Sequence, residues 1–597
     1  MLHKLTAALT FALLSLTPRA VAEPAHGIAL YGVPKEPPGF THFSYVNPDA
    51  PKGGRLVFGS FGSYDSLNPL IVKGVAANGV RDLTIECLMA RGLDEPFTLY
   101  GLVAETVEVP EDRSSITFNL NPRAHFSDGH PITADDVIFS LQLLKEKGRP
   151  NHRTYYAKVA KTERLSDHAV RFKFDAAGDR EVPLIIGLMP VLPKHAINPD
   201  TFENTSLQFP VGSGPYRVGK VDAGRSVTLV RDENYWGRDL PVNRGRYNFD
   251  EIRYDYFREG SVMFDAFKSG QVDLWPEEDP RRWANGYDFP AIRDGRAVKR
   301  EFEIGLPAGM TALVFNTRRT VFADARVREA LIGLFDFEWI NRTLYAGLYQ
   351  RTQSYFERSI LASAGRPADA REREILAPYP NSVKPAVMDG TYRFPSTDGS
   401  GRSRENQEKA FRLLQAAGYE LRDRKLVEAK SGRPLEFEIL ASSTSQEGLL
   451  LSFARDVERL GIKVKLRVVD GAQYQQRLTN YDYDMIQNTW SSSLSPGNEQ
   501  LFRWSTQAAR TDGTYNFAGV ENPAADAMIQ AMLAAKTEED FVSAVRALDR
   551  VLLSGDYVIP LFFIPKQWVA YWTRLQHPEK TPLFGYNVDS WWSADVK

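Results

Sequence analysis

The sequence predicts an α/β protein that folds into more than one lobe. Residues 115–120 and 462–469 alternate apolar with polar or charged side chains, the pattern of a half-buried strand. Capping residues signal helices: Thr133 and Thr537 each stand three residues before an aspartate, and Asp324 precedes an apolar run with helical spacing. At 597 residues the chain is too long for one hydrophobic core. We therefore expect about two to four lobes.

The N-terminus has the features of an export signal. Lys4 supplies a positive charge, residues 5–16 are mostly apolar, and residues 20–22 (Ala-Val-Ala) fit a cleavage site between small side chains. An apolar run of about a dozen residues is too short to cross a bilayer. We expect residues 1–22 to be a signal peptide and the mature protein to begin near Glu23.

Charge and cysteine content narrow the class of protein further. The formal net charge is −2, which argues against nucleic acid as a partner. Cys87 is the only cysteine, so an internal disulfide is excluded, and its position excludes a lipid anchor on a mature N-terminal cysteine. We expect Cys87 to be a buried small apolar residue. These features predict an exported periplasmic protein that is not lipid-anchored.

An uncharged stretch, residues 485–498, is the strongest candidate for a ligand contact. Residues 481–486 predict a short strand with its aromatic side chains on one face, and the chain then passes through Trp490 into a serine-rich loop. Aromatic rings beside hydroxyl and backbone N–H groups suit a neutral or zwitterionic ligand. The alternative is an ordinary polar loop with a tryptophan packed beneath it.

A second loop has similar chemistry. A first strand is predicted at residues 55–58, and it leads into a Gly/Ser loop that carries Phe61 and Tyr64. Before it, residues 27–54 are rich in Gly and Pro and predict an irregular arm. Residues 351–405 predict a long excursion over the surface.

Catalytic and metal-binding motifs are missing from the sequence. It has no Walker loop, no dinucleotide-binding glycine motif, no G-x-S-x-G and no H-E-x-x-H. We expect the close acidic sets Asp482/Asp484 and Glu277 to Asp279 to be solvated charges rather than a glycosidase pair. His125 and His130 flank a turn without a third ligand at a recognisable spacing, so we expect neither a metal nor a cofactor.

Several segments together resemble a known family. They are residues 126–137 (FSDGHPITADDV), 212–216 (GSGPY), 234–236 (NYW), 322–330 (FADARVREA) and 413–419 (LLQAAGY). In this order they resemble the periplasmic solute-binding proteins of the peptide/nickel class (family 5), which serve ATP-driven importers. Residues 42–54 (HFSYVNPDAPKGG), 397–401 (TDGSG) and 493–500 (SLSPGNEQ) resemble the Yej-type subgroup, similar to binding proteins for oligopeptides and for the peptide-nucleotide antibiotic microcin C.

The resemblance implies an α/β, two-lobed periplasmic binding protein (type II, cluster C) with a hinge and an extra domain. The expected boundaries are residues 23–75, 180–305 and 566–597 for lobe I, 76–179 for the extra domain and 306–565 for lobe II. The lobes would close on the ligand. The implied partners are a peptide or peptide-like ligand and the permease subunits of an ABC importer in the inner membrane, and the protein would be a monomer.

The resemblance also implies a set of ligand contacts on both lobes. They are Phe61, Gly62, Ser63, Tyr64, Lys73, Tyr156, Asn316, Asn488, Trp490, Ser491, Ser492, Ser493, Ser495, Asn498 and Glu499. Many related peptide binders have an aspartate three residues after the loop tryptophan, where it pairs with the ligand α-ammonium, but here that position is Ser493. Either another carboxylate, such as Glu499, binds the amine, or the amine is not recognised.

Two other functions stay open from the sequence alone. The same fold can bind a non-peptide solute, such as a sugar derivative or an opine. A periplasmic hydrolase is the alternative from another class, and a turnover assay on peptides separates it from a binding protein.

Overall fold

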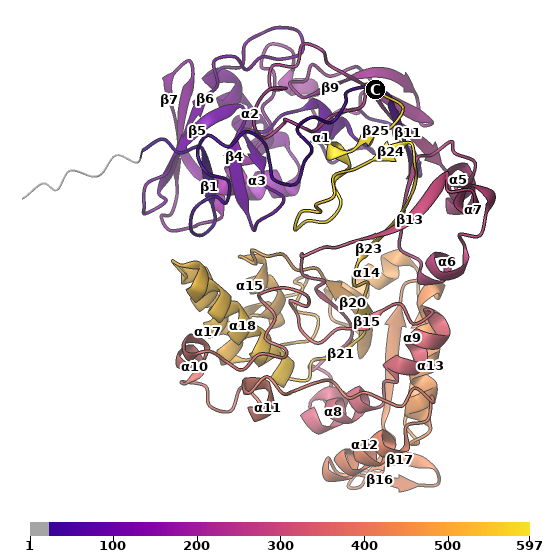
Figure 1. Ribbon diagram of the computed structural model, residues 1–597. Coiled ribbons are helices and arrows are strands. Elements are labelled where there is room, and N and C mark those ends of the chain that lie inside the picture. Colours follow the sequence, from indigo (N-terminus) through magenta and orange to yellow (C-terminus); the bar gives the residue numbers. More distant parts are fainter. Residues whose placement is uncertain (1–22, 597) are drawn as a thin grey trace, which may run out of the picture.

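The computed structural model describes residues 23–596, so the expected signal peptide at residues 1–22 lies outside the described residues. Figure 1 shows two bodies, one above the other, joined by strands that pass between them. The upper body holds lobe I and the extra domain, and the lower body is lobe II. In the part of the chain that the structure describes, every helix is too short or too polar to cross a membrane.

Lobe I is built on a mixed sheet of seven strands. They are β2 (Arg55–Phe61), β9 (Tyr216–Asp222), β10 (Ser226–Arg231), β11 (Glu251–Phe257), β12 (Leu274–Glu277), β13 (Ala297–Phe302) and β23 (Gln567–Trp572). In space their order is β13-β23-β12-β2-β11-β10-β9. The helices of this lobe are α1 (Val80–Thr84), α5 (Gly260–Lys268), α6 (Pro280–Asn285) and α7 (Pro290–Arg293), and a small ribbon pairs β24 (Leu575–Gln576) with β25 (Trp592–Ser593).

The extra domain contains two smaller antiparallel sheets. One has the order β5-β6-β8-β7 and the other β1-β4-β3. The elements are β1 (Gly27–Ala29), β3 (Met89–Arg91), β4 (Thr98–Gly101), β5 (Ala104–Glu108), β6 (Ser115–Leu120), β7 (Val159–Ser166), β8 (Ala169–Phe174), α2 (Ala134–Lys147), α3 (Pro150–Tyr156) and α4 (Val182–Gly187). The predicted strand at residues 115–120 is confirmed as β6, and Thr133 caps α2 in a capping box with Asp136, as predicted.

Two segments that we expected in lobe I pack with the extra domain instead. β1 pairs with β4, and Ile28 and Tyr45 belong to the same hydrophobic core as Leu99. Leu184 of α4, with Ile186, Met189, Val191 and Leu192, contributes to this core as well. The arm at residues 27–54 is therefore irregular apart from β1, and several of its apolar side chains are buried against a neighbouring sheet, whereas Val33 is 86% exposed.

Lobe II is built on a five-stranded sheet with the order β19-β18-β20-β14-β21. The strands are β14 (Met310–Phe315), β18 (Glu436–Ala441), β19 (Lys463–Val468), β20 (Met485–Trp490) and β21 (Val558–Pro560). Its longer helices are α8 (Ala325–Gly333), α9 (Phe337–Leu344), α12 (Arg404–Ala416), α13 (Glu447–Glu458), α14 (Gly471–Thr479), α17 (Pro523–Ala534) and α18 (Glu538–Ser554). Asp324 caps α8 and Thr537 caps α18, which confirms both predicted helix starts.

Smaller elements complete lobe II. They are α10 (Ala370–Leu376), α11 (Pro385–Met388), α15 (Glu499–Trp504), α16 (Thr506–Ala509), the pair β15 (Gln350–Arg351) and β22 (Phe562–Phe563), and the hairpin β16 (Tyr419–Arg422) and β17 (Lys425–Glu428). The excursion at residues 351–405 contains α10 and α11. It is not confined to the surface, because Leu361, Val387 and Phe394 are buried in the core of lobe II.

The strand predicted at residues 481–486 is wrong in position. The strand is β20, Met485–Trp490, and Tyr481 has a positive φ of 52° in the turn before it. The reason is a contact that is distant in sequence: the amide of Asn316 donates to the carbonyl oxygens of Tyr481 and Tyr483 and holds that turn. Trp490 is consequently the last residue of a strand and not part of the loop.

The acidic sets are also placed differently from the prediction. Glu277 is 3% exposed, not solvated, and its carboxylate accepts hydrogen bonds from Arg282, from the Tyr287 hydroxyl and from the Trp275 indole. Asp482 is exposed but forms ion pairs with Arg319 and Arg477. Neither set brings two free carboxylates together, because Asp279 and Asp484, like Glu277 and Asp482, have basic or hydrogen-bonding neighbours, and only Glu278 of the first set is left as an exposed charge.

Candidate functional site

The strands of lobe I place the predicted loop after β2 at the edge that faces lobe II. β13 points toward lobe II, because the chain leaves its end and enters that lobe at β14. β12 and β13 both pair antiparallel with β23, so they run in the same direction, and β2 and β11 run parallel to β12. The carboxyl end of β2, at Phe61, therefore lies at the edge of the sheet that faces lobe II.

The strands of lobe II place the serine loop at the opposite edge. β14 begins where the chain arrives from lobe I, and β20 pairs antiparallel with β14, so the carboxyl end of β20 lies on the side of lobe I. β18 runs parallel to β20 and ends at the same edge. Ligands of α/β proteins bind at the carboxyl ends of strands. The topology thus sets residues 61–64 and 491–498 at the two sheet edges that face each other.

A cavity of about 560 Å³ lies between the two bodies. Pro96 and Leu583 line it from the upper body, Leu494 of the serine loop and Arg358 line it from lobe II, and Gly305 of the connecting segment lies between them. Sites for small ligands have volumes of roughly 300–1,000 Å³. This cavity is therefore large enough for a short peptide, and one residue of the predicted loop is part of its wall.

The loop of lobe I carries an exposed apolar side chain at this edge of the sheet. Phe61 is 70% exposed, an unusual position for a phenylalanine at the end of a central strand. Gly62 has a φ of 92° and donates its N–H to Phe257. The Ser63 hydroxyl donates a hydrogen bond to the carbonyl oxygen of Gly224. Tyr64 is buried, and its hydroxyl donates to the carbonyl oxygen of Ser226. In this loop, Phe61 is therefore the large side chain that remains exposed to solvent.

Trp490 is a core residue of lobe II in this structure. It is 4% exposed, and its indole N–H donates to the carbonyl oxygen of Tyr515 over 3.1 Å. Its ring lies 4.7 Å from the Trp504 ring and 6.0 Å from that of Phe517, measured between centroids. The ring supports the serine loop from beneath, which is the arrangement that the alternative interpretation of this stretch described.

The serines after Trp490 hold the loop in shape. The Ser492 hydroxyl donates to the carbonyl oxygen of Tyr355 over 2.8 Å, and the Ser493 hydroxyl accepts from the Ser495 N–H over 3.2 Å. Ser495 is buried, whereas Ser491 is exposed and its carbonyl oxygen accepts from Arg503. Since a hydroxyl oxygen can accept a second hydrogen bond, the Ser493 side chain can still form a hydrogen bond with a ligand.

Carboxylates gather where the extra domain meets lobe II. Glu181, just before α4, lies beside the start of α15, where the Asn498 side chain hydrogen-bonds to it. Burial, with the negative charges of Glu499 and Asp179, raises the pKa of Glu181 to about 7. Glu499 accepts hydrogen bonds from the Gly497 N–H and from Gln500. The two glutamates thus approach each other from the extra domain and from lobe II.

Two other predicted contacts lie inside the protein, and a third is half-buried. Asn316 is fully buried and its amide holds the turn before β20, so the structure gives it a structural role. Tyr156 is buried, and its ring stacks on His152 with centroids 5.4 Å apart. Asn488 lies on β20 opposite Ala312, and its buried amide nitrogen has no hydrogen-bond partner among the described residues.

Sequence reasoning missed further residues at these edges. Lys73, a predicted ligand contact, is exposed, and Val72 and Val75 beside it are exposed apolar side chains in the same loop region. Residues 442–445 (SSTS) follow the carboxyl end of β18 and add a second hydroxyl-rich segment. Two valines in a glycine-containing loop could have been recognised in the sequence as candidate ligand contacts. Nothing near Glu181 in the sequence indicates that this residue lies beside α15.

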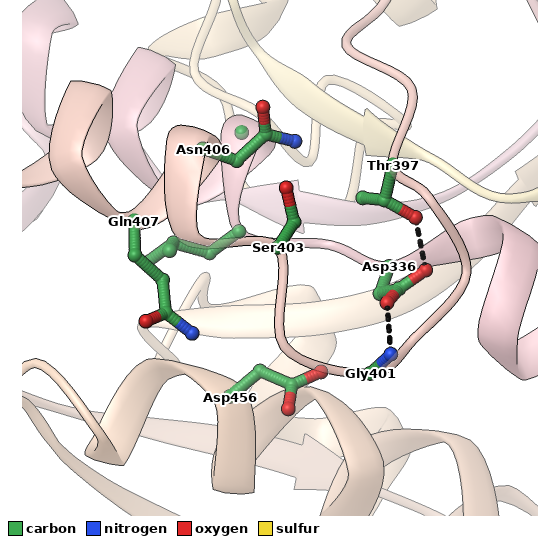
Figure 2. A pocket seen from close by; sticks show the side chains of 9 residues that line it. Asp336, Thr397, Gly401, Ser403, Asn406, Gln407 and Asp456 are labelled. Atoms are coloured by element: carbon green, nitrogen blue, oxygen red, sulfur yellow. Dashed lines mark hydrogen bonds between the residues drawn. The ribbon is translucent and has the colours of Figure 1, made fainter.

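A second cavity lies wholly within lobe II and is too small for such a ligand. Its volume is about 10 Å³, room for about one water molecule. Figure 2 shows Asp336 accepting hydrogen bonds from Thr397 and from the Gly401 N–H, with Asp456 facing the same space. Burial raises the pKa of Asp456 to about 6. These contacts fix residues 397–401, the end of the excursion, to the body of lobe II.

Curated relatives match the chain along almost its full length. Peptidoglycan-binding protein YepA of Agrobacterium fabrum is 46% identical and covers 97% of this chain and 96% of its own length. A second protein of the same organism, named "Probable peptide-binding protein YejA", is 41% identical over 95% of this chain and 94% of its own.

Solved structures share the fold at low sequence identity. The oligopeptide-binding protein AppA from Bacillus subtilis, in complex with a nonapeptide, has a TM-score of 0.64, with 18% identity, over 92% of this chain and all of its own. NikA from Brucella suis, in complex with Fe(III)-EDTA, has a TM-score of 0.67, with 20% identity, over 90% of this chain and 98% of its own.

The pattern of a protein family matches most of the chain. The family described as "Bacterial extracellular solute-binding proteins, family 5 Middle" matches residues 98–512, which include most of the extra domain and the serine loop. The relatives and the shared two-lobed fold agree with this match. The chain therefore belongs to the bacterial extracellular solute-binding proteins of family 5, and it is of the Yej type.

Proposed function

We propose that this protein is the periplasmic binding component of an ABC importer, and that it captures oligopeptides or peptide-like compounds between its lobes and delivers them to the inner-membrane permease. The observation that carries the proposal is the cavity of about 560 Å³ between the two bodies, with the uncharged serine loop in its wall. The protein would act as an unanchored monomer after removal of residues 1–22.

The chemistry of the cleft supports a peptide as the ligand. Phe61, Val72 and Val75 offer exposed apolar contacts near the lobe I edge, and residues 491–495 offer hydroxyl and backbone groups on the other side. An extended peptide pairs with backbone groups whatever its side chains, so such a cleft gives affinity with little sequence selectivity. The printed names of YepA and YejA, which refer to peptidoglycan and to peptides, point to the same class.

The ligand amine requires a carboxylate that Ser493 cannot provide. We infer that Glu499 takes this role, because it follows the serine loop directly and its charge is close enough to raise the pKa of Glu181. An ammonium group between Glu499 and Glu181 would offset the repulsion of two carboxylates that approach from opposite lobes. Ligand binding and lobe closure would then favour each other.

The first test compares Phe61→Ala with Leu421→Ala by calorimetry on a mixed panel of short peptides. Truncation of an aromatic side chain at the centre of a binding site typically costs roughly 2 kcal/mol or more, which is over tenfold in affinity. Leu421 is a matched control, because it is 54% exposed and lies on the β16–β17 hairpin at the far end of lobe II. Equal peptide affinities for both variants would place the site elsewhere.

The second test addresses the amine. Glu499→Gln should weaken the binding of a peptide with a free N-terminus and leave an N-acetylated peptide unaffected. Equal losses for both peptides would mean that Glu499 supports the loop but does not contact the amine.

The same panel distinguishes the alternatives. A ligand that binds only the folded state raises the melting temperature by mass action. If sugar derivatives or opines raise it and peptides do not, the protein binds a non-peptide solute. Mass spectrometry of the peptides after incubation should recover them intact, and cleavage would indicate a hydrolase.

A further inference from the structure

Two histidines and an aspartate meet on the surface where the extra domain joins the segment that follows α4. Asp128 and His130 lie in the turn after β6, and His195 lies 65 positions further along the chain than His130. Asp128 Oδ2 is 2.7 Å from His195 Nε2 and 3.2 Å from His130 Nδ1. One ligand atom from each of the three residues lies within 4.8 Å of the other two.

The local fold holds the three side chains in this arrangement. Gly129 has a φ of 89°, so the turn folds back and the His130 N–H donates to Asp128 over 3.2 Å. The imidazole rings of His130 and His195 stack with centroids 4.1 Å apart, and the buried Phe126 ring packs edge-on against His195. The side chains therefore converge before any ligand is present.

We propose that Asp128, His130 and His195 form a binding site for a late first-row divalent cation such as Zn²⁺, Ni²⁺ or Cu²⁺. Such a metal has ligand bonds of about 2.0–2.2 Å, so its ligand atoms stand roughly 3 Å or more from one another. The distances of 2.7 and 3.2 Å from Asp128 to the two histidines need to open by only a few tenths of an ångström, within the freedom of side chains at the surface.

The donor set selects the class of metal. Two imidazole nitrogens and one carboxylate oxygen suit Zn²⁺, Cu²⁺ and Ni²⁺, whereas Mg²⁺ and Ca²⁺ require oxygen ligands. The Asp128 carboxylate supplies the negative charge that a cation requires, and its Oδ2 lies within 3.2 Å of one ring nitrogen of each histidine.

The position of the site shows what kind of metal binding to expect. The side chains of Asp128, His130 and His195 keep 31%, 60% and 33% of their surface exposed. With three protein ligands on an open surface, the remaining coordination positions are free for water, so the metal should exchange readily. None of the three residues lines the cavity between the lobes, so this inference is independent of the proposed function.

The test is calorimetry with Zn²⁺ and, separately, Mg²⁺ on the mature protein without a histidine tag. We expect saturable binding of one Zn²⁺ and none of Mg²⁺. Changing a residue that merely orients a metal ligand costs about 10–100-fold in affinity, so His195→Asn and His130→Asn should each cost at least tenfold. His125→Asn is the matched control, because His125 lies in the same turn and its ring contacts the carbonyl oxygen of Phe126 instead.

Spectroscopy with Cu²⁺ identifies the ligands. Electron paramagnetic resonance should show coupling to two imidazole nitrogens in the parent protein and to one in His195→Asn. The proposal is overturned if Zn²⁺ fails to saturate one site, if the His125→Asn control loses as much affinity as His195→Asn, or if the Cu²⁺ spectrum is the same in all variants. In those cases the three side chains form only a hydrogen-bonded surface cluster.

Discussion

The guanidinium group of Arg358 donates two hydrogen bonds, of 3.1 and 3.0 Å, to the carbonyl oxygen of Leu306. A third, of 3.0 Å, goes to the carbonyl oxygen of Ile564. Leu306 lies on the segment that leads from β13 into lobe II, and Ile564 lies on the segment that returns to β23. β13 and β23 are antiparallel neighbours, so Arg358 holds both connections between the lobes at one point.

Arg358→Ala should loosen this hinge. The variant loses charge-assisted hydrogen bonds to both connecting segments, each worth about 1.5–3 kcal/mol when buried. We expect faster amide hydrogen exchange in residues 303–309 and 564–566 and a larger radius of gyration without ligand. Arg366→Ala is the control, since Arg366 is exposed and lines the same cavity. Unchanged exchange in both variants would show that the hinge does not depend on Arg358.

Lobe closure should depend on pH through Glu181. Its pKa is raised to about 7 by burial and by Glu499 and Asp179, while Lys158 lowers it. When the lobes open, lobe II moves away from Glu181, and the pKa of Glu181 returns toward its ordinary value of 4.5. The closed form therefore binds the proton more tightly, so closure is favoured as the pH falls from 8 to 5 and is lost as the pH rises through 7.

Small-angle scattering at these pH values measures that effect. The ligand-free protein should be more compact at pH 5, and Glu181→Gln should be compact at both pH values. Glu111→Gln, an exposed change in the same domain, should behave like the parent protein. A parent protein whose dimensions are the same at both pH values would contradict the role given to Glu181.

Trp490 should govern stability more than a single loop hydrogen bond does. Trp490→Ala removes a buried ring and should lower the free energy of unfolding by about 3–5 kcal/mol. Ser493→Ala removes the acceptor for the Ser495 N–H and should cost about 0.5–1.5 kcal/mol. Denaturant titration of both variants measures the difference. Near-equal losses would mean that the indole contributes little to the core of lobe II.

Glu277 should prove essential to the fold of lobe I. Glu277→Ala leaves the Tyr287 hydroxyl and the Trp275 indole N–H without an acceptor. We expect a loss of about 3 kcal/mol, at the lower end for a broken buried pair, because Arg282 keeps contact with water. The neighbouring Glu278 is exposed, so Glu278→Ala should change stability by less than about 0.5 kcal/mol. Equal effects of the two substitutions on the melting temperature would refute this assignment.

Local signals in the sequence predicted the structure well. Thr133, Asp324 and Thr537 mark helix starts correctly, because a cap and the N–H groups that it serves lie within three residues of each other. The strand at residues 115–120 has one buried side, so alternation identifies it.

Features that depend on distant contacts could not be predicted in this way. The turn at Tyr481 is held by Asn316, and the burial of Glu277 depends on the sheet around it. Trp490 looks the same in sequence whether it faces a cleft or, as here, packs on Trp504. His195 joins Asp128 only through the tertiary fold, so no spacing rule could find that cluster.

Hydrogen exchange on adding a peptide tests the central claim most directly. If the ligand lies between the lobes, amides in both residues 61–64 and residues 491–498 should exchange more slowly with peptide than without, and the β16–β17 hairpin should not change. Protection of only one of the two loops, or of neither while calorimetry shows binding, would contradict a site formed by the two facing sheet edges.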